Sequence, residues 1–324
     1  MANSTKWDLE KHFDKSKFEE QRKLWKTEVT KFAEKYRKDN SYLKDSKKLL
    51  MALEELEELE TNYGSTSDEV YYYWLKSQKD QDDPKIKAKF NQIENFSIEI
   101  SNQLEFFMLD LAKISEEKQK EFLSNEELKK YKHLLKKLFE NAKYLLSEKE
   151  EIILNLKSQS SYSLWVSMVE RLLSKEQREV KGESGESKNR TYEELLSLLK
   201  SKDKDIRDGA AKAFNDILEN NVNVAEEELN AVLNNKQVND SLRGLERPDE
   251  ARHVSDDIDT SVVDTLVKTV EENYDISQKF YKLKAKLLGL QKLEYHERAV
   301  EYGNITKEYS YEDSIDLVSK TFKY

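Results

Sequence analysis

Hydrophobic residues recur along almost the whole chain at intervals of three and four, which is the spacing of one face of an α-helix. One such stripe consists of Trp25, Val29, Phe32 and Tyr36, and comparable stripes continue as far as Phe322. Glycine and proline number only 7 and 2 in 324 residues, whereas tight turns and strand ends depend on them. The pattern predicts an all-α, multi-helix protein with short polar loops.

Several helix starts are marked by a capping residue in front of a hydrophobic stripe. Asp83–Pro84 is typical of an N-cap followed by proline at the first helical position, where the missing N–H costs no hydrogen bond. The pairs Ser147–Glu150 and Thr191–Glu194 have the spacing of capping boxes, in which each side chain accepts from an unpaired N–H. Ser310 predicts the start of a last helix.

Two breaks in the helical pattern suggest how the chain is divided. The polar segment 181–190, KGESGESKNR, holds two of the seven glycines and predicts a linker between an N-terminal helical domain, 1–180, and a second unit, 191–324. The stretch 293–309 contains Gly303–Asn304 between tyrosines, which allows one short β-hairpin there. The last stripe reaches Phe322 without a closing glycine, proline or polar tail, which predicts a continuation beyond this chain.

Composition excludes several classes of partner and chemistry. Lys and Arg total 55 against 65 Asp and Glu, a net charge of −10 with the signs interleaved, so the clustered cations that nucleic acid requires are not expected. The chain has no cysteine, which excludes disulfides, thiolate metal ligands and thiol nucleophiles. No apolar run approaches the ~18 residues of a membrane span, and the first residues lack a signal-peptide core. We therefore expect a cytoplasmic protein without a membrane partner.

Zinc hydrolysis is the reaction that a large helical enzyme most readily hosts, through the motif H-E-x-x-H. The chain has four histidines, at His12, His133, His253 and His296. No two of them are close enough in sequence to bind one metal from one helix. His296–Glu297 begins the motif, but Val300 occupies the place of the second histidine. We expect no catalytic residue, no metal ligand and no bound cofactor in this chain.

Other catalytic patterns are incomplete as well. Gly182–Ser184 begins like a nucleophile elbow, but Glu186 stands where the closing glycine belongs. Paired carboxylates such as Glu54–Glu55 are typical of a solvated helix face, although an acid/base pair has the same composition. The aromatic run Tyr71–Trp74 favours packing between helices over a peptide groove.

Three arginines stand close together near a predicted turn, at Arg243, Arg247 and Arg252. They have the charge to hold a carboxylate ligand. Local ion pairing is the favoured interpretation. Its expected partners are Glu246, Asp249 and Glu250.

Four segments follow one another in the second half: TYEELLSLL at 191–199, SKDKDIRDGAA at 201–211, LRGLERP at 242–248 and YKLKAKLLGLQKL at 281–293. The last is followed by Tyr295 and by YSYEDSIDLV at 309–318. Together they resemble the oligoendopeptidase F family of thimet-oligopeptidase-like zinc metallopeptidases. In the first half, Trp7–Leu9, LLSE at 145–148 and Trp165 resemble the opening and the N-terminal helical domain of that family.

The resemblance implies a helical fold around a deep channel, one zinc ion held by H-E-x-x-H plus a later glutamate, and hydrolysis of short peptides. In the family those ligands lie beyond the YSYEDSIDLV-like helix, so zinc is expected for the full-length enzyme, and this chain is expected to be its inactive N-terminal part. Its implied partners are short peptides and the missing C-terminal half.

Tyr295, His296 and Arg298 are the candidates for the channel wall, although YHERAV at 295–300 departs from the Tyr-Asp…Ala-Pro type sequence that the family often has there. A non-catalytic helical scaffold or adaptor derived from the same family is the alternative.

Overall fold

The computed structural model describes residues 8–63, 68–303, 307 and 309–322. Contacts between Cα atoms divide the chain into two compact units. The helical unit comprises Glu10–Arg171 and Val224–Thr260, and the hairpin unit comprises Leu172–Asn223 and Ser261–Tyr324 together with the segment up to Leu9. Helices dominate both units, so the all-α prediction is confirmed. Within the described residues, no helix is both long and apolar enough to cross a membrane.

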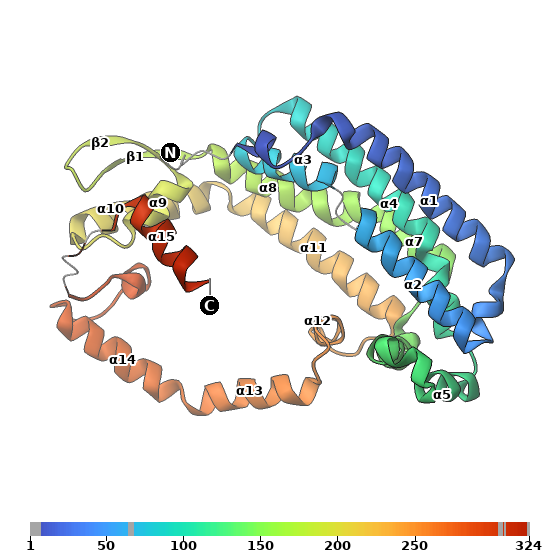
Figure 1. Ribbon diagram of the computed structural model, residues 1–324. Coiled ribbons are helices and arrows are strands. Elements are labelled where there is room, and N and C mark those ends of the chain that lie inside the picture. Colours follow the sequence, from blue (N-terminus) through green and yellow to red (C-terminus); the bar gives the residue numbers. More distant parts are fainter. Residues whose placement is uncertain (1–7, 64–67, 304–306, 308, 323–324) are drawn as a thin grey trace. The chain divides into compact units, whose positions relative to one another are not determined.

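The helical unit is built from long helices that lie side by side, among them α1, α2, α4 and α7 (Figure 1). Its helices are α1 (Phe18–Lys38), α2 (Ser46–Tyr63), α3 (Asp68–Lys79), α4 (Pro84–Ala112), α5 (Glu116–Ser124), α6 (Lys132–Asn141), α7 (Glu148–Ser158) and α12 (Glu250–Ser255), with most of α8 (Leu164–Lys175) and α11 (Val222–Arg243). A π-helical turn, Gln159–Ser163, joins α7 to α8.

An aromatic cluster lies in the core of the helical unit. The ring of Phe107 on α4 is fully buried and stacks on Tyr42, with 4.7 Å between the ring centroids. Phe32 and Tyr36 on α1 meet the same ring at steeper angles. The stripe that contains Trp25, Phe32 and Tyr36 is thus the buried face of α1, as its spacing predicts.

The hairpin unit combines two strands, β1 (Gln177–Lys181) and β2 (Ser187–Thr191), with α9 (Tyr192–Leu198) and α10 (Lys204–Asn220). Leu195, Ile206, Ala210 and Ile217 form its small buried core with Val180. The unit continues with α13 (Thr260–Glu272), α14 (Tyr274–Leu287), a 3₁₀ segment at Tyr295–Ala299 and α15 (Tyr311–Thr321).

The structure places a β-hairpin at the segment that was predicted to be a linker. The segment 181–190 is part of an antiparallel hairpin in which Lys181 pairs with Ser187. Two glycines close its turn. Gly185 adopts φ +84°, and a Cβ at Gly182 would lie 1.8 Å from the Arg190 guanidinium.

No strand lies in the described part of 293–309, where Tyr295–Ala299 is 3₁₀-helical and residues 304–306 and 308 lie outside the described residues. The division into domains at 1–180 and 191–324 stays a prediction.

The predicted helix starts are confirmed. Asp83 accepts from the N–H groups of Lys85 and Ile86 at 2.8 and 3.3 Å, with Pro84 at the first helical position. Reciprocal capping boxes are present at Ser147, Thr191 and Ser310. Each is worth about 1 kcal/mol, since it satisfies an N–H that the helix leaves unpaired.

Candidate functional site

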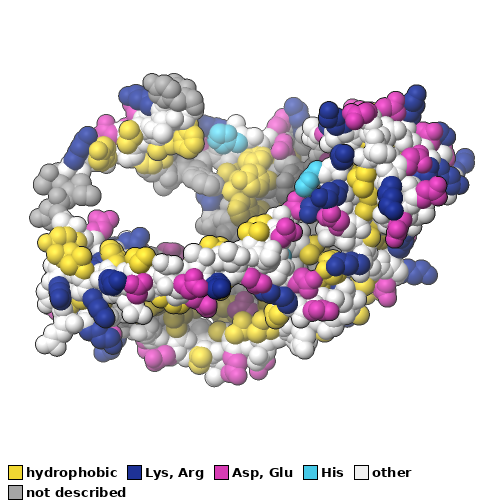
Figure 2. Space-filling model, turned by 90° about the horizontal axis from the view of Figure 1, so that it is seen from below, with side chains coloured by type: hydrophobic (Ala, Val, Ile, Leu, Met, Phe, Trp, Pro, Cys, Tyr) yellow, Lys and Arg dark blue, Asp and Glu magenta, His cyan; other side chains and the backbone are white. Residues whose placement is uncertain are grey.

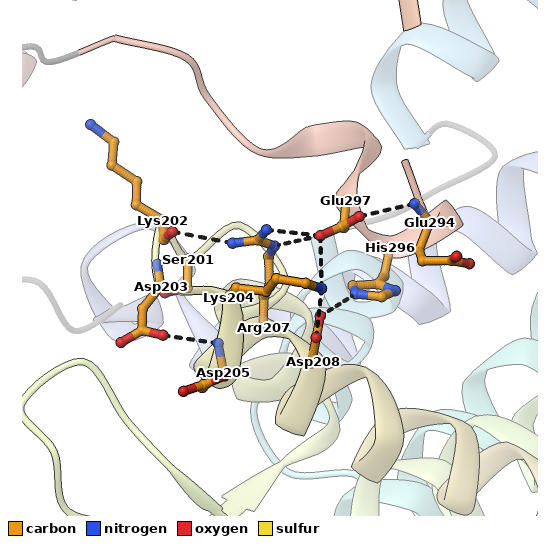
Figure 3. Close-up of polar contacts among 10 residues, drawn as sticks. All are labelled: Ser201, Lys202, Asp203, Lys204, Asp205, Arg207, Asp208, Glu294, His296 and Glu297. Atoms are coloured by element: carbon orange, nitrogen blue, oxygen red, sulfur yellow. Dashed lines mark hydrogen bonds and ion pairs between the residues drawn. The ribbon is translucent and has the colours of Figure 1, made fainter. Parts of the chain in front are cut away.

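A cluster of ionisable groups in the hairpin unit surrounds the 3₁₀ segment Tyr295–Ala299, which packs against the start of α10 (Figure 3). This segment contains the three candidates for a channel wall and the incomplete zinc motif. A capping box fixes its start, because the backbone N–H of Glu294 donates to Oε2 of Glu297 at 2.9 Å. Glu297 is thereby turned inward, and only 1% of its surface is exposed.

Arg207 on α10 binds this buried carboxylate. Its Nε and one terminal nitrogen donate to Oε1 of Glu297 at 3.1 and 2.8 Å, and the other terminal nitrogen donates to the Lys202 carbonyl at 3.1 Å. Lys204 approaches the same Oε1 at 3.3 Å. This buried ion pair connects two segments that lie 90 residues apart in the sequence. Burial of either charge without the other would be strongly unfavourable.

A second ion pair lies at the rim of this cluster. Nε2 of His296 lies 2.8 Å from Oδ1 of Asp208, and Nζ of Lys204 lies 2.7 Å from Oδ2 of the same carboxylate (Figure 3). Burial raises the pKa of Asp208, but the contacts with Lys204 and His296 outweigh it and hold that pKa below its ordinary value. The contact with Asp208 thus holds the His296 ring against α10.

Asp208, His296 and Glu297 each offer a ligand atom, and these atoms lie within 4.8 Å of one another. Both carboxylates already have cationic partners. Oε1 of Glu297 accepts from Arg207 and Lys204, and Oε2 accepts from a backbone N–H. A zinc ion would have to displace two cations from these carboxylates, and Val300, in the place of the second motif histidine, is buried. These residues do not fit a zinc ion.

The other two channel-wall candidates are exposed and contact each other. The ring of Tyr295 is 79% exposed, and the Arg298 guanidinium lies 3.8 Å from its centroid. Arg298 also donates to the Tyr295 carbonyl at 3.0 Å. The structure therefore places His296 against α10, with Tyr295 and Arg298 stacked on each other at the surface, and their role in a channel wall stays a prediction.

The prediction of local ion pairing is correct for two of the three arginines and wrong for Arg243. Arg247 pairs locally with Asp249 at 2.8 Å, as predicted, and Arg252 pairs with Asp256, another local carboxylate. Arg243 does not pair locally. It donates twice to Glu151 on α7, at 2.7 Å each, and to the Tyr144 carbonyl at 3.1 Å. Arg243 thus links the end of α11 to α7 through an ion pair within the helical unit.

Comparison with known proteins gives this fold a context. A family model described as Oligopeptidase F matches residues 110–175. The group B oligopeptidase PepB of Streptococcus agalactiae is 24% identical over 302 residues, which cover 90% of this chain and 49% of that protein. A plasmid-encoded oligoendopeptidase F of Lactococcus lactis is 22% identical with the same coverage. The crystal structure of oligoendopeptidase F from Enterococcus faecium matches with a TM-score of 0.75 at 20% identity, over 88% of this chain and 54% of that one.

The chain is similar to oligoendopeptidase F proteins over about 90% of its length. The resemblance read from its sequence motifs is confirmed. The chain spans about half the length of the curated relatives that it matches.

Acid is expected to weaken the Arg207–Glu297 contact. Burial raises the pKa of Glu297, but the Glu294 N–H, Arg207 and Lys204 outweigh it, so the pKa lies below its ordinary 4.5. The unfolded chain then binds a proton more readily than the folded one, and the stabilisation present above about pH 4.5 is lost as the pH falls through the lower, folded value. Unfolding free energies measured from pH 7 down to about pH 3 test this, because the loss falls below about pH 4.5. Glu297→Gln should show a flatter pH dependence, and equal slopes in both proteins would contradict it.

Proposed function

We propose that this chain is the N-terminal part of a zinc-dependent oligoendopeptidase that hydrolyses short peptides within a helical channel. The observation that carries the proposal is the extent of the match, since 90% of this chain aligns with only 49% of a curated oligopeptidase. The cytoplasmic location expected from the sequence is part of the same proposal.

Exposed hydrophobic surface supports the proposal that a C-terminal half packs on this chain. The face shown in Figure 2 exposes several patches of hydrophobic side chains between charged ones. In the hairpin unit the exposed hydrophobic residues along α13 and α14 include Val262, Leu266, Val270, Ile276, Phe280, Leu283 and Leu287. A groove of about 370 Å³ runs between Phe280, Leu287 and Tyr302. Contiguous apolar surface of this kind usually marks a contact with another part of a protein, and the missing C-terminal half is the occupant that we propose.

The chemistry would come from residues outside this chain, because the cluster at Glu297 does not fit zinc. Zinc, when bound by a peptidase, polarises the scissile carbonyl and lowers the pKa of the attacking water. The residues of this chain would shape the space around the peptide. Arg207 and Glu297 fix the 3₁₀ segment, so that Tyr295 and Arg298 are presented at a defined place on the surface.

The test compares the 324-residue chain with the protein read through to the end of its coding sequence, each incubated with a quenched fluorescent peptide of about eight residues. We expect no turnover above background for the chain alone, and turnover by the longer protein that a chelator abolishes and zinc restores. The matched control is the longer protein with the glutamate of its H-E-x-x-H motif changed to glutamine.

Two outcomes would contradict the proposal. Hydrolysis by the chain alone would show that its own residues carry the chemistry. A stop codon after Tyr324, with a folded and monodisperse chain, would favour the scaffold or adaptor.

A further inference from the structure

A pocket of about 250 Å³ opens in the helical unit between α3, the first turns of α4 and the π-helical turn before α8. All its lining residues belong to this one unit. Trp74, Phe90 and Leu164 supply apolar walls. The volume suits a ligand of the size of one amino acid, just below the usual range for small-molecule sites. The cluster around Glu297 lies in the other unit, so this pocket is a separate feature.

Two hydrogen-bond acceptors in the pocket are incompletely compensated for their burial. Oε1 of Gln81 is completely buried and accepts no hydrogen bond from any described residue. The Glu94 carboxylate is partly buried, and burial raises its pKa, while a hydrogen bond from Gln159 offsets that rise only in part. A buried acceptor without a donor costs about 1–3 kcal/mol. A ligand that brings N–H donors and a positive charge would relieve both groups.

The aromatic wall favours the same kind of ligand. The indole of Trp74 is 42% exposed and stacks on Tyr71, with 5.5 Å between the centroids. This stacking holds the ring in place. Of the three tyrosines in the run, Tyr72 alone is buried. Tryptophan is the best ring for a cation–π contact.

The charges around the pocket are mixed, with an acidic excess. Asp80, Glu94 and Glu170 line it together with Lys87 and Arg171. Three carboxylates against two cations favour a cationic ligand over an anionic one.

The π-helical turn forms part of the pocket wall and interrupts the regular α-helical geometry there. Gln159 and Ser163, its first and last residues, both line the pocket. A π turn widens the helix by one residue per turn and displaces side chains from the α-helical positions, and such turns are frequent at functional sites.

We propose that this pocket binds a small organic cation, a guanidinium with an alkyl stem, with Glu94 and Gln81 as its acceptors and Trp74 as its aromatic wall. This binding activity is separate from peptide hydrolysis and does not rest on it. The planar guanidinium supplies several N–H donors, enough for a carboxylate and an amide oxygen together, and its stem fits against Phe90 and Leu164.

Isothermal titration of the 324-residue chain with L-argininamide tests the proposal. The matched probe is L-citrullinamide, which has the same shape and the same α-ammonium but a neutral urea in place of the guanidinium. We expect argininamide to bind at least about tenfold more tightly, because a charge-assisted hydrogen bond is worth about 1.5–3 kcal/mol. Equal affinities, or no argininamide binding at about 10 mM, would overturn the proposal.

Variants then locate the site. Glu94→Gln should weaken argininamide binding at least about tenfold, and Trp74→Leu about two- to fivefold. Gln81→Leu removes the unpaired buried oxygen, so it should weaken binding while the thermal midpoint stays the same or rises, which separates lost binding from lost folding. The control is Glu20→Gln, the same charge change at an exposed site on α1. Unchanged binding by Glu94→Gln, or an equal loss with Glu20→Gln, would show that argininamide binds elsewhere on the acidic surface.

Discussion

Arg207→Met is expected to destabilise the hairpin unit by about 3–5 kcal/mol, the usual cost of leaving one member of a buried ion pair behind. Glu297 is 1% exposed, and Arg207 supplies two of the hydrogen bonds to its Oε1. Lys204 still reaches this oxygen at 3.3 Å but is half-exposed, so it compensates weakly. The charge of Glu297 would then be buried without its main partner.

The measurement must report on the unfolding of the hairpin unit, which contains Arg207 and Glu297. Three of the four tryptophans, Trp25, Trp74 and Trp165, lie in the helical unit, so tryptophan fluorescence reports mainly on that unit. Hydrogen exchange of the α10 amides follows the hairpin unit instead.

Two variants serve as controls. Arg298→Met removes an exposed arginine from the same 3₁₀ segment and should change stability by no more than about 0.5 kcal/mol. The double variant Arg207→Met/Glu297→Gln should regain much of the loss, because the stranded charge is gone while the amide oxygen still accepts from Glu294. A loss below about 1 kcal/mol for Arg207→Met alone would contradict the role assigned to this pair.

Features that depend on local chemistry were predictable from the sequence. The stripe through Trp25 and Tyr36 identifies the buried face of α1, and the capping boxes at Ser147 and Thr191 identify helix starts. In both cases the residues that interact lie within one or two turns of one another, so their spacing carries the information.

Features that depend on distant partners were not predictable in the same way. The hairpin at 177–191 is polar on both strands, and among its strand residues Val180 and Arg190 alone are buried, so no alternation distinguishes it from a linker. Arg243 has acidic neighbours in sequence, yet its partner is Glu151, 92 residues away.

One signal pointed toward the Arg207–Glu297 pair. Arg207 lies on the apolar face of α10, beside Ile206 and three residues before Ala210. A cation on a buried face requires a carboxylate there. The sequence offers many carboxylates, and the fold alone selects Glu297.

Phe107→Ala is expected to destabilise the helical unit by about 3–5 kcal/mol, since it removes a fully buried ring and leaves a cavity. The ring of Phe107 on α4 contacts Phe32 and Tyr36 on α1 and Tyr42 in the segment that follows α1, and close packing of these elements opposes a collapse that would refill the space. Urea denaturation followed by far-UV circular dichroism and by tryptophan fluorescence measures the loss. A loss below about 1 kcal/mol would show that the cluster is loosely packed.

Phe280→Ala is the matched control, because it is the same substitution at a ring that is 55% exposed on α14. In the 324-residue chain it should cost no more than about 0.5 kcal/mol. In the longer protein the proposed function predicts a different result, since a second half that covers the α13–α14 stripe would bury this ring. Its removal should then cost about 2 kcal/mol or more. An equally small effect in both proteins would leave Phe107 as the centre of the core while showing that nothing packs on Phe280.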